Sequence, residues 1–129
     1  MKTTDLFIKE ASDTGKPMDI RLPNGKIIES ALTVLGADSN AFADEMATAR
    51  RKEIELLEQK EKLSPIEYAK KQKAIREEML SVLVTGWTFE EPFNRAAVNV
   101  LFINAPYVLE QVDNFASIRE NFFAKPSMD

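Results

Sequence analysis

The chain begins with apolar and polar residues in alternation, the pattern of a strand with one buried face. Met18, Ile20 and Leu22 are separated by single polar residues, and the run Leu22-Pro23-Asn24-Gly25-Lys26 follows at once. Proline, asparagine and glycine suit successive positions of a three-residue hairpin loop, in which glycine takes the left-handed conformation. The pattern therefore predicts a β-hairpin.

The length of this loop sets the register of the hairpin. A three-residue loop pairs Ile20 with Ile28, whereas a two-residue loop places the charge of Glu29 opposite Ile20, so the longer loop is preferred. The apolar character of residues 6–9 and 31–35 suggests additional strand at both places.

A helical period replaces the alternation after Gly36, which breaks the strand. Asp38 or Ser39 can accept the unpaired N–H groups of a new helix, and the pattern predicts that this helix runs to about Lys62. Its charged surface carries one narrow apolar stripe, formed by Phe42, Met46, Ala49, Ile54 and Leu57.

A second long helix is predicted from the run Ser64-Pro65-Ile66-Glu67. Serine caps the helix, proline fits its first position, and Glu67 reaches back to the N–H of the cap. One side of the helix is lined by Tyr68, Ile75, Met79, Val82 and Leu83. Because only a short connection separates the two helices, we expect them to fold into an antiparallel hairpin whose charged tip projects into solvent.

Two shorter helices are predicted after Thr85-Gly86, which we expect to end the second long helix. An aromatic connection at 87–93 precedes Asn94, which caps a helix through Ile103. The run Asn104-Ala105-Pro106 opens the last helix. Its apolar positions are Val108, Leu109, Val112, Phe115 and Ile118, continuing toward Phe122.

The predicted fold class is mainly α (α+β), with an N-terminal β-hairpin or small sheet followed by about four helices. The 129 residues are the usual size of one domain. Within it we expect a β-hairpin region at 1–37, the long antiparallel helical hairpin at 38–84, C-terminal helices at 85–123 and a mobile tail at 124–129.

Composition narrows the kinds of function that are open to this domain. The formal net charge of −4 leaves no excess of Lys and Arg to neutralise phosphates, and acidic residues interleave with the basic ones from Arg50 to Lys62. Nucleic acid is therefore a poor candidate partner. No segment has the character of a signal peptide or membrane span, so we expect a cytoplasmic protein that binds no membrane.

Catalysis is equally disfavoured by composition. The chain has 0 histidines and 0 cysteines, so it lacks the commonest general base, thiolate nucleophiles, the commonest transition-metal ligand and sulfur-ligated zinc sites. The adjacent carboxylates Glu77-Glu78 and Glu90-Glu91 point apart on a helix and make no site alone. We expect no enzymatic activity, no metal and no cofactor.

Three pieces of the sequence, in this order and spacing, resemble tail assembly chaperones of long-tailed bacteriophages and prophages. The first is the hairpin turn from Leu22 to Gly25 followed by Gly36-Ala37-Asp38-Ser39-Asn40-Ala41-Phe42. The second is the charged helical pair, which ends in Leu83-Val84-Thr85-Gly86-Trp87. The third comprises Pro92-Phe93-Asn94, Asn104-Ala105-Pro106-Tyr107-Val108 and Arg119-Glu120-Asn121-Phe122.

This resemblance implies a chaperone that acts in the bacterial host cytoplasm and is absent from the mature virion. It would bind the tape measure protein and bring tail tube subunits to it, the latter through a longer frameshifted product in many such families. It also implies repeated alignment of copies along one client, so a homo-oligomer is expected, with an exposed strand edge as one candidate contact. The alternatives are a structural tail protein that stays in the virion and a small helical adaptor of other function.

Six side chains are the candidate partner-binding residues. Met46, Met79, Trp87 and Phe89 can form an apolar groove for a client helix, or they can fill the core where the hairpin meets the C-terminal helices. Phe122 and Phe123 can contact a partner, or they can pack on their own domain.

Overall fold

The computed structural model describes residues 1–124, and the sequence prediction of a mobile tail at 124–129 lies outside the described residues except for Ala124. The elements, in chain order, are η1 (Thr3–Leu6), α1 (Lys9–Thr14), β1 (Lys16–Arg21), β2 (Ile27–Val34), α2 (Asn40–Glu58), η2 (Lys60–Lys62), α3 (Pro65–Ser81), β3 (Val84–Trp87), α4 (Arg95–Asn104), α5 (Pro106–Ser117) and η3 (Arg119–Phe122). The predicted fold class is confirmed: residues 1–124 are mainly α, with one small antiparallel sheet.

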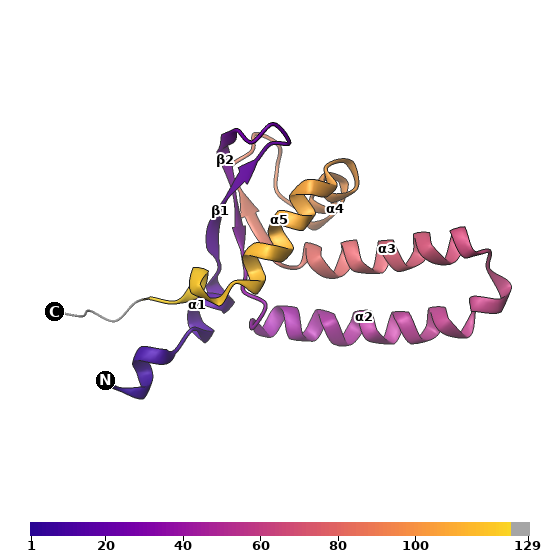
Figure 1. The fold of residues 1–129 in the computed structure, drawn as a ribbon, viewed down its shortest axis with the longest axis horizontal. Coiled ribbons are helices and arrows are strands. Elements are labelled where there is room, and N and C mark those ends of the chain that lie inside the picture. Colours follow the sequence, from indigo (N-terminus) through magenta and orange to yellow (C-terminus); the bar gives the residue numbers. More distant parts are fainter. Residues whose placement is uncertain (125–129) are drawn as a thin grey trace.

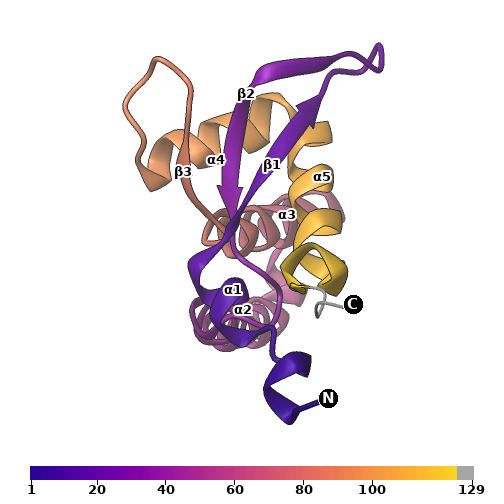
Figure 2. The ribbon, with the colours of Figure 1, turned by 90° about the vertical axis from the view of Figure 1, so that its left-hand side faces the viewer.

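The molecule has a body and an arm. The body is the sheet, in the order β1-β2-β3, covered by α4, α5 and the end of α3 (Figures 1 and 2). The arm is the antiparallel pair α2 and α3, which projects sideways from the body (Figure 1). Only the end of the arm that meets the body shares the main core, through the buried side chains of Phe42 and Leu80.

The β-hairpin closes through the predicted three-residue loop. Leu22 N–H donates to the carbonyl of Lys26 at 2.8 Å, and Gly25 has a φ of +89°, the left-handed conformation that glycine adopts without a Cβ penalty. Asn24 Oδ1 accepts from Lys26 N–H at 3.0 Å and fixes the turn.

The register of the hairpin shifts once along its length. At the tip Arg21 pairs with Ile27, the register predicted from the loop, but Asp19 then pairs with Ala31, so two steps along β1 match four along β2. Ile20 therefore lies at a bulge and not in a regular pair with Ile28. Because the register shifts by an even number of residues, each side chain stays on the same face of the sheet. Met18 therefore still pairs with Leu32 on the buried face.

The prediction of strand at residues 6–9 is wrong, because this segment leads from the 3₁₀ turn η1 into α1. The outer edge of β1 has little room for another strand at Arg21. The side chain of Gln111 on α5 accepts from Arg21 N–H at 2.9 Å and donates to the Arg21 carbonyl at 2.7 Å. This amide pairs with the strand edge as another strand would.

The predicted end of the second long helix at Thr85-Gly86 is also wrong. Helix α3 ends at Ser81, and the chain forms β3, which pairs antiparallel with β2. Leu35 N–H donates to the Leu83 carbonyl at 2.7 Å as the two segments meet. The β-branched Val84 and the aromatic Trp87 suit a strand once a neighbouring edge is present.

The predicted apolar stripe of the first long helix is only partly correct. Phe42, Ala49 and Leu56 are the buried residues of α2, spaced by seven, whereas Ile54 and Leu57 are 54% and 57% exposed. The α-helix ends at Glu58, and the separate 3₁₀ turn η2 follows at Lys60–Lys62. A two-helix contact buries one narrow seam, so residues beside that seam stay in solvent.

The N-terminal caps of α2, α3 and α4 form as predicted. Ser64 Oγ accepts from Glu67 N–H at 3.2 Å and Glu67 Oε1 accepts from Ser64 N–H at 3.4 Å. Ser39 and Asn94 cap α2 and α4 through their side-chain oxygens. Helix α5 ends at Ser117, so Ile118, which the sequence pattern placed in the apolar stripe, is exposed.

A close backbone approach joins α1 to the turn before α2. Gly36 N–H donates to the Ser12 carbonyl at 3.0 Å, and a Cβ added to Gly36 would lie 2.5 Å from Ser12 Oγ and 3.1 Å from Ser12 Cα. Ser12 is buried, and its hydroxyl has no hydrogen-bond partner among residues 1–124. This contact depends on the absence of a side chain at Gly36.

Gly36→Ala should lower the free energy of unfolding by about 1–3 kcal/mol, because the added methyl group forces α1 away from its site. Ser12→Ala should leave stability unchanged or raise it by up to about 1 kcal/mol, because the lost hydroxyl is unsatisfied. Urea unfolding measures both. Gly86→Ala is the matched control, since its Cβ would meet nothing closer than 3.8 Å. Equal effects of Gly36→Ala and Gly86→Ala would show that α1 does not pack as described.

A second long-range contact holds η3 beside the start of α2. Arg119 donates through Nε and Nη2 to the two carboxylate oxygens of Asp38, at 2.8 and 3.0 Å. The hydrogen bond from Arg119 lowers the pKa of Asp38 below its ordinary value, and burial opposes this only in part. The ion pair is partly exposed, so its contribution to stability is small.

Because the folded-state pKa of Asp38 is depressed, the stability it contributes is complete above the unfolded-state pKa, near 3.9, and is lost as pH falls through the lower folded-state pKa. Asp38→Asn should therefore destabilise the protein at neutral pH, and the difference from wild type should shrink on acidification to about pH 3. Urea midpoints across this pH range measure it. A difference that is independent of pH would contradict the assignment to this carboxylate.

Candidate functional site

The strongest candidate binding site is an apolar groove beside the end of β3. Its walls are the end of the strand, the loop that follows it and the outer face of α4, and its volume is about 490 Å³. The lining residues are Trp87, Phe89, Glu91, Ala97, Val100, Leu101 and Asn104. We call this feature the Trp87 groove.

Trp87 anchors the aromatic wall of the groove. It pairs with Leu32 as the last residue of β3, and its Nε1–H donates to the Glu91 carbonyl at 2.8 Å. Phe89 and Phe93 contact its ring edge-on, with centroid distances of 5.4 and 5.3 Å. Such edge-to-face contacts hold large apolar side chains in defined positions.

The loop between β3 and α4 is also hydrogen-bonded to the sheet at its first residue, Thr88. Thr88 N–H donates to the Ala31 carbonyl at 3.1 Å, and Thr88 Oγ1 accepts from Ala31 N–H at 2.9 Å. At its far end Asn94 Oδ1 caps α4 by accepting from Ala97 N–H at 2.8 Å. The aromatic wall is therefore tied to the sheet on one side and to α4 on the other.

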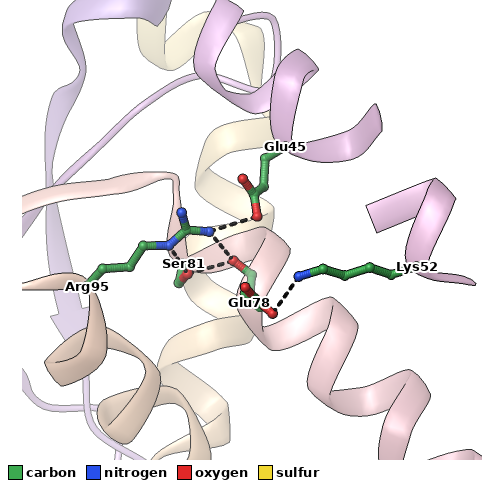
Figure 3. A network of polar contacts seen from close by, with 5 residues as sticks. All are labelled: Glu45, Lys52, Glu78, Ser81 and Arg95. Atoms are coloured by element: carbon green, nitrogen blue, oxygen red, sulfur yellow. Dashed lines mark hydrogen bonds and ion pairs between the residues drawn. The ribbon is translucent and has the colours of Figure 1, made fainter. Parts of the chain in front are cut away.

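The helical wall of the groove is fixed to the arm by a polar network around Arg95, the first residue of α4 (Figure 3). Arg95 Nη2 donates to Glu45 at 2.8 Å and to the Glu78 carbonyl at 2.9 Å, and Nε donates to Ser81 Oγ at 3.0 Å. Lys52 adds an ion pair with the Glu78 carboxylate at 3.0 Å. One guanidinium thus joins α2, α3 and α4.

The structure brings together two of the six predicted partner-binding residues, Trp87 and Phe89, in the Trp87 groove. Met46 is exposed on α2, and Met79 is partly buried against the core. Phe122 is 2% exposed and meets the Phe115 ring edge-on at 5.7 Å, so it packs on its own domain. Phe123 is partly buried at the end of the described chain.

Sequence reasoning missed the helical wall of the groove, Ala97, Val100 and Leu101. The sequence does contain an indication of this wall, because α4 carries apolar residues around most of its circumference. A helix of that kind has an apolar face beyond the one that packs on the core. Val98 and Phe102 face the core, which leaves Val100 59% exposed.

The lining of the groove is mostly apolar. Its polar groups are one carboxylate, Glu91, and one amide, Asn104, at an apolar surface. Within residues 1–124 no three acidic side chains come close enough to hold a metal ion. No helix in the same range is long and apolar enough to cross a bilayer.

The fold and the groove define the class: a mainly α domain with a small antiparallel sheet and an open, mostly apolar groove. A family profile described as phage tail assembly chaperone matches residues 1–117, and the chain belongs to this family. Its partners are accordingly proteins of tail assembly. Neither the curated proteins nor the solved structures include a match to the chain.

Proposed function

We propose that the chain holds apolar helical segments of the tape measure protein in the Trp87 groove while the phage tail is assembled. The observation that carries this proposal is an open groove with an aromatic wall and an apolar helical wall, on which Val100 is exposed and Leu101 is half-buried, in a member of a chaperone family. Contiguous apolar surface of this kind normally marks a site that another molecule covers.

A helix is the form of client that suits this groove best. An apolar helix face presents side chains at spacings of three and four residues, and such anchors dock into grooves lined by aromatic and aliphatic groups. Glu91 and Asn104 at the rim can meet the polar flank of that helix. Binding of this kind is non-covalent, and we propose that the chain performs no enzymatic chemistry and needs no cofactor. Mass spectrometry of the client after release should then show an unchanged mass.

We also propose that tail tube subunits join the complex, through a longer frameshifted product where one is made. Membership of the family supports this step, because tail assembly requires the tube to form around the tape measure protein. Co-expression of the chain, the tape measure protein and the tube protein tests it. Failure of the tube protein to co-purify, with or without the longer product, would exclude the recruiting role.

Val100→Asp should reduce the tape measure protein that co-purifies from co-expressing cells by about tenfold or more, because a charge placed on the groove wall costs roughly 1.4 kcal/mol or more of binding free energy. Ile103→Asp is the matched control. Val100 and Ile103 lie on the same helix and are both 59% exposed, but Ile103 does not line the groove. Circular dichroism and urea unfolding check that both variants fold. Equal loss in the two variants, or no loss in either, would remove the groove from the proposal.

The proposed site of action is the host cytoplasm, with the chain released before the virion is complete. Quantitative mass spectrometry of purified virions should then detect tape measure protein without this chain, while infected-cell lysates contain both. A fixed ratio of the chain to the tape measure protein in virions would instead support the alternative of a structural tail protein.

A further inference from the structure

The lining of the Trp87 groove includes one charged residue, Glu91. Glu91 lies in the loop between β3 and α4, and its carbonyl accepts from Trp87 Nε1–H at 2.8 Å. This hydrogen bond fixes the backbone of Glu91 beside the aromatic wall of the groove. The carboxylate is therefore attached to a fixed point at the margin of an apolar surface.

The Glu91 carboxylate has no cation of its own within the described part of the chain. Among residues 1–124 neither Glu91 nor its neighbour Glu90 forms an ion pair, and both are exposed. The next basic residue along the sequence is Arg95, and its guanidinium is bound to Glu45 at 2.8 Å. The negative charge of Glu91 is therefore available to a partner.

The part of the chain that builds the groove is acidic as a whole. It runs from residue 82 to residue 117, and its charged residues are Glu90, Glu91, Arg95, Glu110 and Asp113. Glu110 and Asp113 already pair with Arg76 of α3. The unpaired negative charge of this segment is thus carried by the two glutamates of the loop, which favours a positively charged partner over a negatively charged one.

The helical wall of the groove determines how a bound helix lies. Ala97, Val100, Leu101 and Asn104 follow one another at helical spacings of three, four and seven residues from Ala97, so they form one row along α4. A client helix that packs along this row points its apolar stripe into the groove. The polar positions on either side of that stripe then face the margins, as the flanking positions of a coiled coil do, and Glu91 lies at a margin.

We propose that Glu91 selects client helices that carry Lys or Arg beside their apolar stripe. This inference rests on the proposed function, because it assumes a helix in the Trp87 groove, and it adds the sign of the charge that the helix must carry. A cation at the flanking position forms an ion pair with Glu91, whereas a carboxylate there is repelled by Glu91 and Glu90. Attraction of the right partner and repulsion of the wrong one both contribute to such selectivity.

The fluorescence of Trp87 reports directly on the groove, because the chain has 1 tryptophan. The probes are two synthetic helical peptides without Trp or Tyr, which share one leucine stripe and differ only in carrying Lys or Glu at the flanking positions. We expect the Lys peptide to bind the full chain about fivefold more tightly or better at roughly 50 mM salt, with a ratio that falls as salt is added. Isothermal titration calorimetry repeats the comparison without the fluorescence signal.

Charge variants test the assignment to Glu91. Glu91→Gln should reduce the preference for the Lys peptide about threefold, and Glu91→Lys should reverse it in favour of the Glu peptide. Glu90→Lys is the matched control, since it makes the same change of charge at the adjacent exposed residue, which does not line the groove. Equal effects of Glu90→Lys and Glu91→Lys would show that the overall charge decides, and would overturn the role of Glu91.

The same titrations separate this inference from the proposed function. Val100→Asp should weaken the binding of both peptides, because it changes the wall that they share. If both peptides bind the wild-type chain equally, or the Glu peptide binds more tightly, the charge selection is refuted and the groove remains a client site. If neither peptide binds by either method, or binding is unchanged in Val100→Asp, the proposed function fails together with the selection.

Discussion

The rest of the structure depends on how little apolar surface the small sheet offers to the two long helices. The buried face of the sheet, with Met18, Leu32 and Val34, is covered by α4, α5 and only the last turn of α3 and the residues after it. Helix α3 has 17 residues and α2 has 19, lengths of about 25 and 28 Å. Most of the arm therefore has no neighbour except its own partner helix, and it must be charged on its outer faces to stay in solvent. Ile54 and Leu57 are exceptions to this charged surface, because they are exposed and belong neither to the core nor to the buried contact between α2 and α3.

The same constraint places the Trp87 groove. Because α3 reaches the sheet only at its end, the chain can enter β3 directly and complete the edge of β2, which carries Trp87 to the margin of the body. The loop must then return to α4, whose start is held by Arg95 against the first part of α2 and the last turn of α3 (Figure 3). Helix α4 uses Val98 and Phe102 to cover the core, and Ala97, Val100 and Leu101 line the groove beside the aromatic loop. The groove is thus the space between a strand end and a helix that are fixed independently.

The features predictable from sequence were those decided by neighbours in the chain. The loop at Gly25, the caps at Ser39, Ser64 and Asn94, and the antiparallel arm depend on local chemistry, and all form as predicted. The errors arise where a distant segment decides the outcome. Residues 6–9 have the sequence pattern of a strand, but the side chain of Gln111 pairs with the edge of β1 at Arg21. Residues 84–87 form a strand because they pair with the free edge of β2. For the site, Trp87 and Phe89 were identifiable as clustered aromatics, whereas Val100 required knowledge of which face of α4 meets the core.

A weak binding surface suits a protein that must hold a client and later leave it. A groove of about 490 Å³ contacts only a short part of a helix, and the free energy of such a contact is reduced by the cost of ordering both partners. A long client with many apolar segments can nevertheless be covered securely, because several grooves act on one chain and linked contacts raise the effective concentration of the next. Each contact could still dissociate singly, so that assembly of the tube could displace the copies one after another without an energy source or a covalent step.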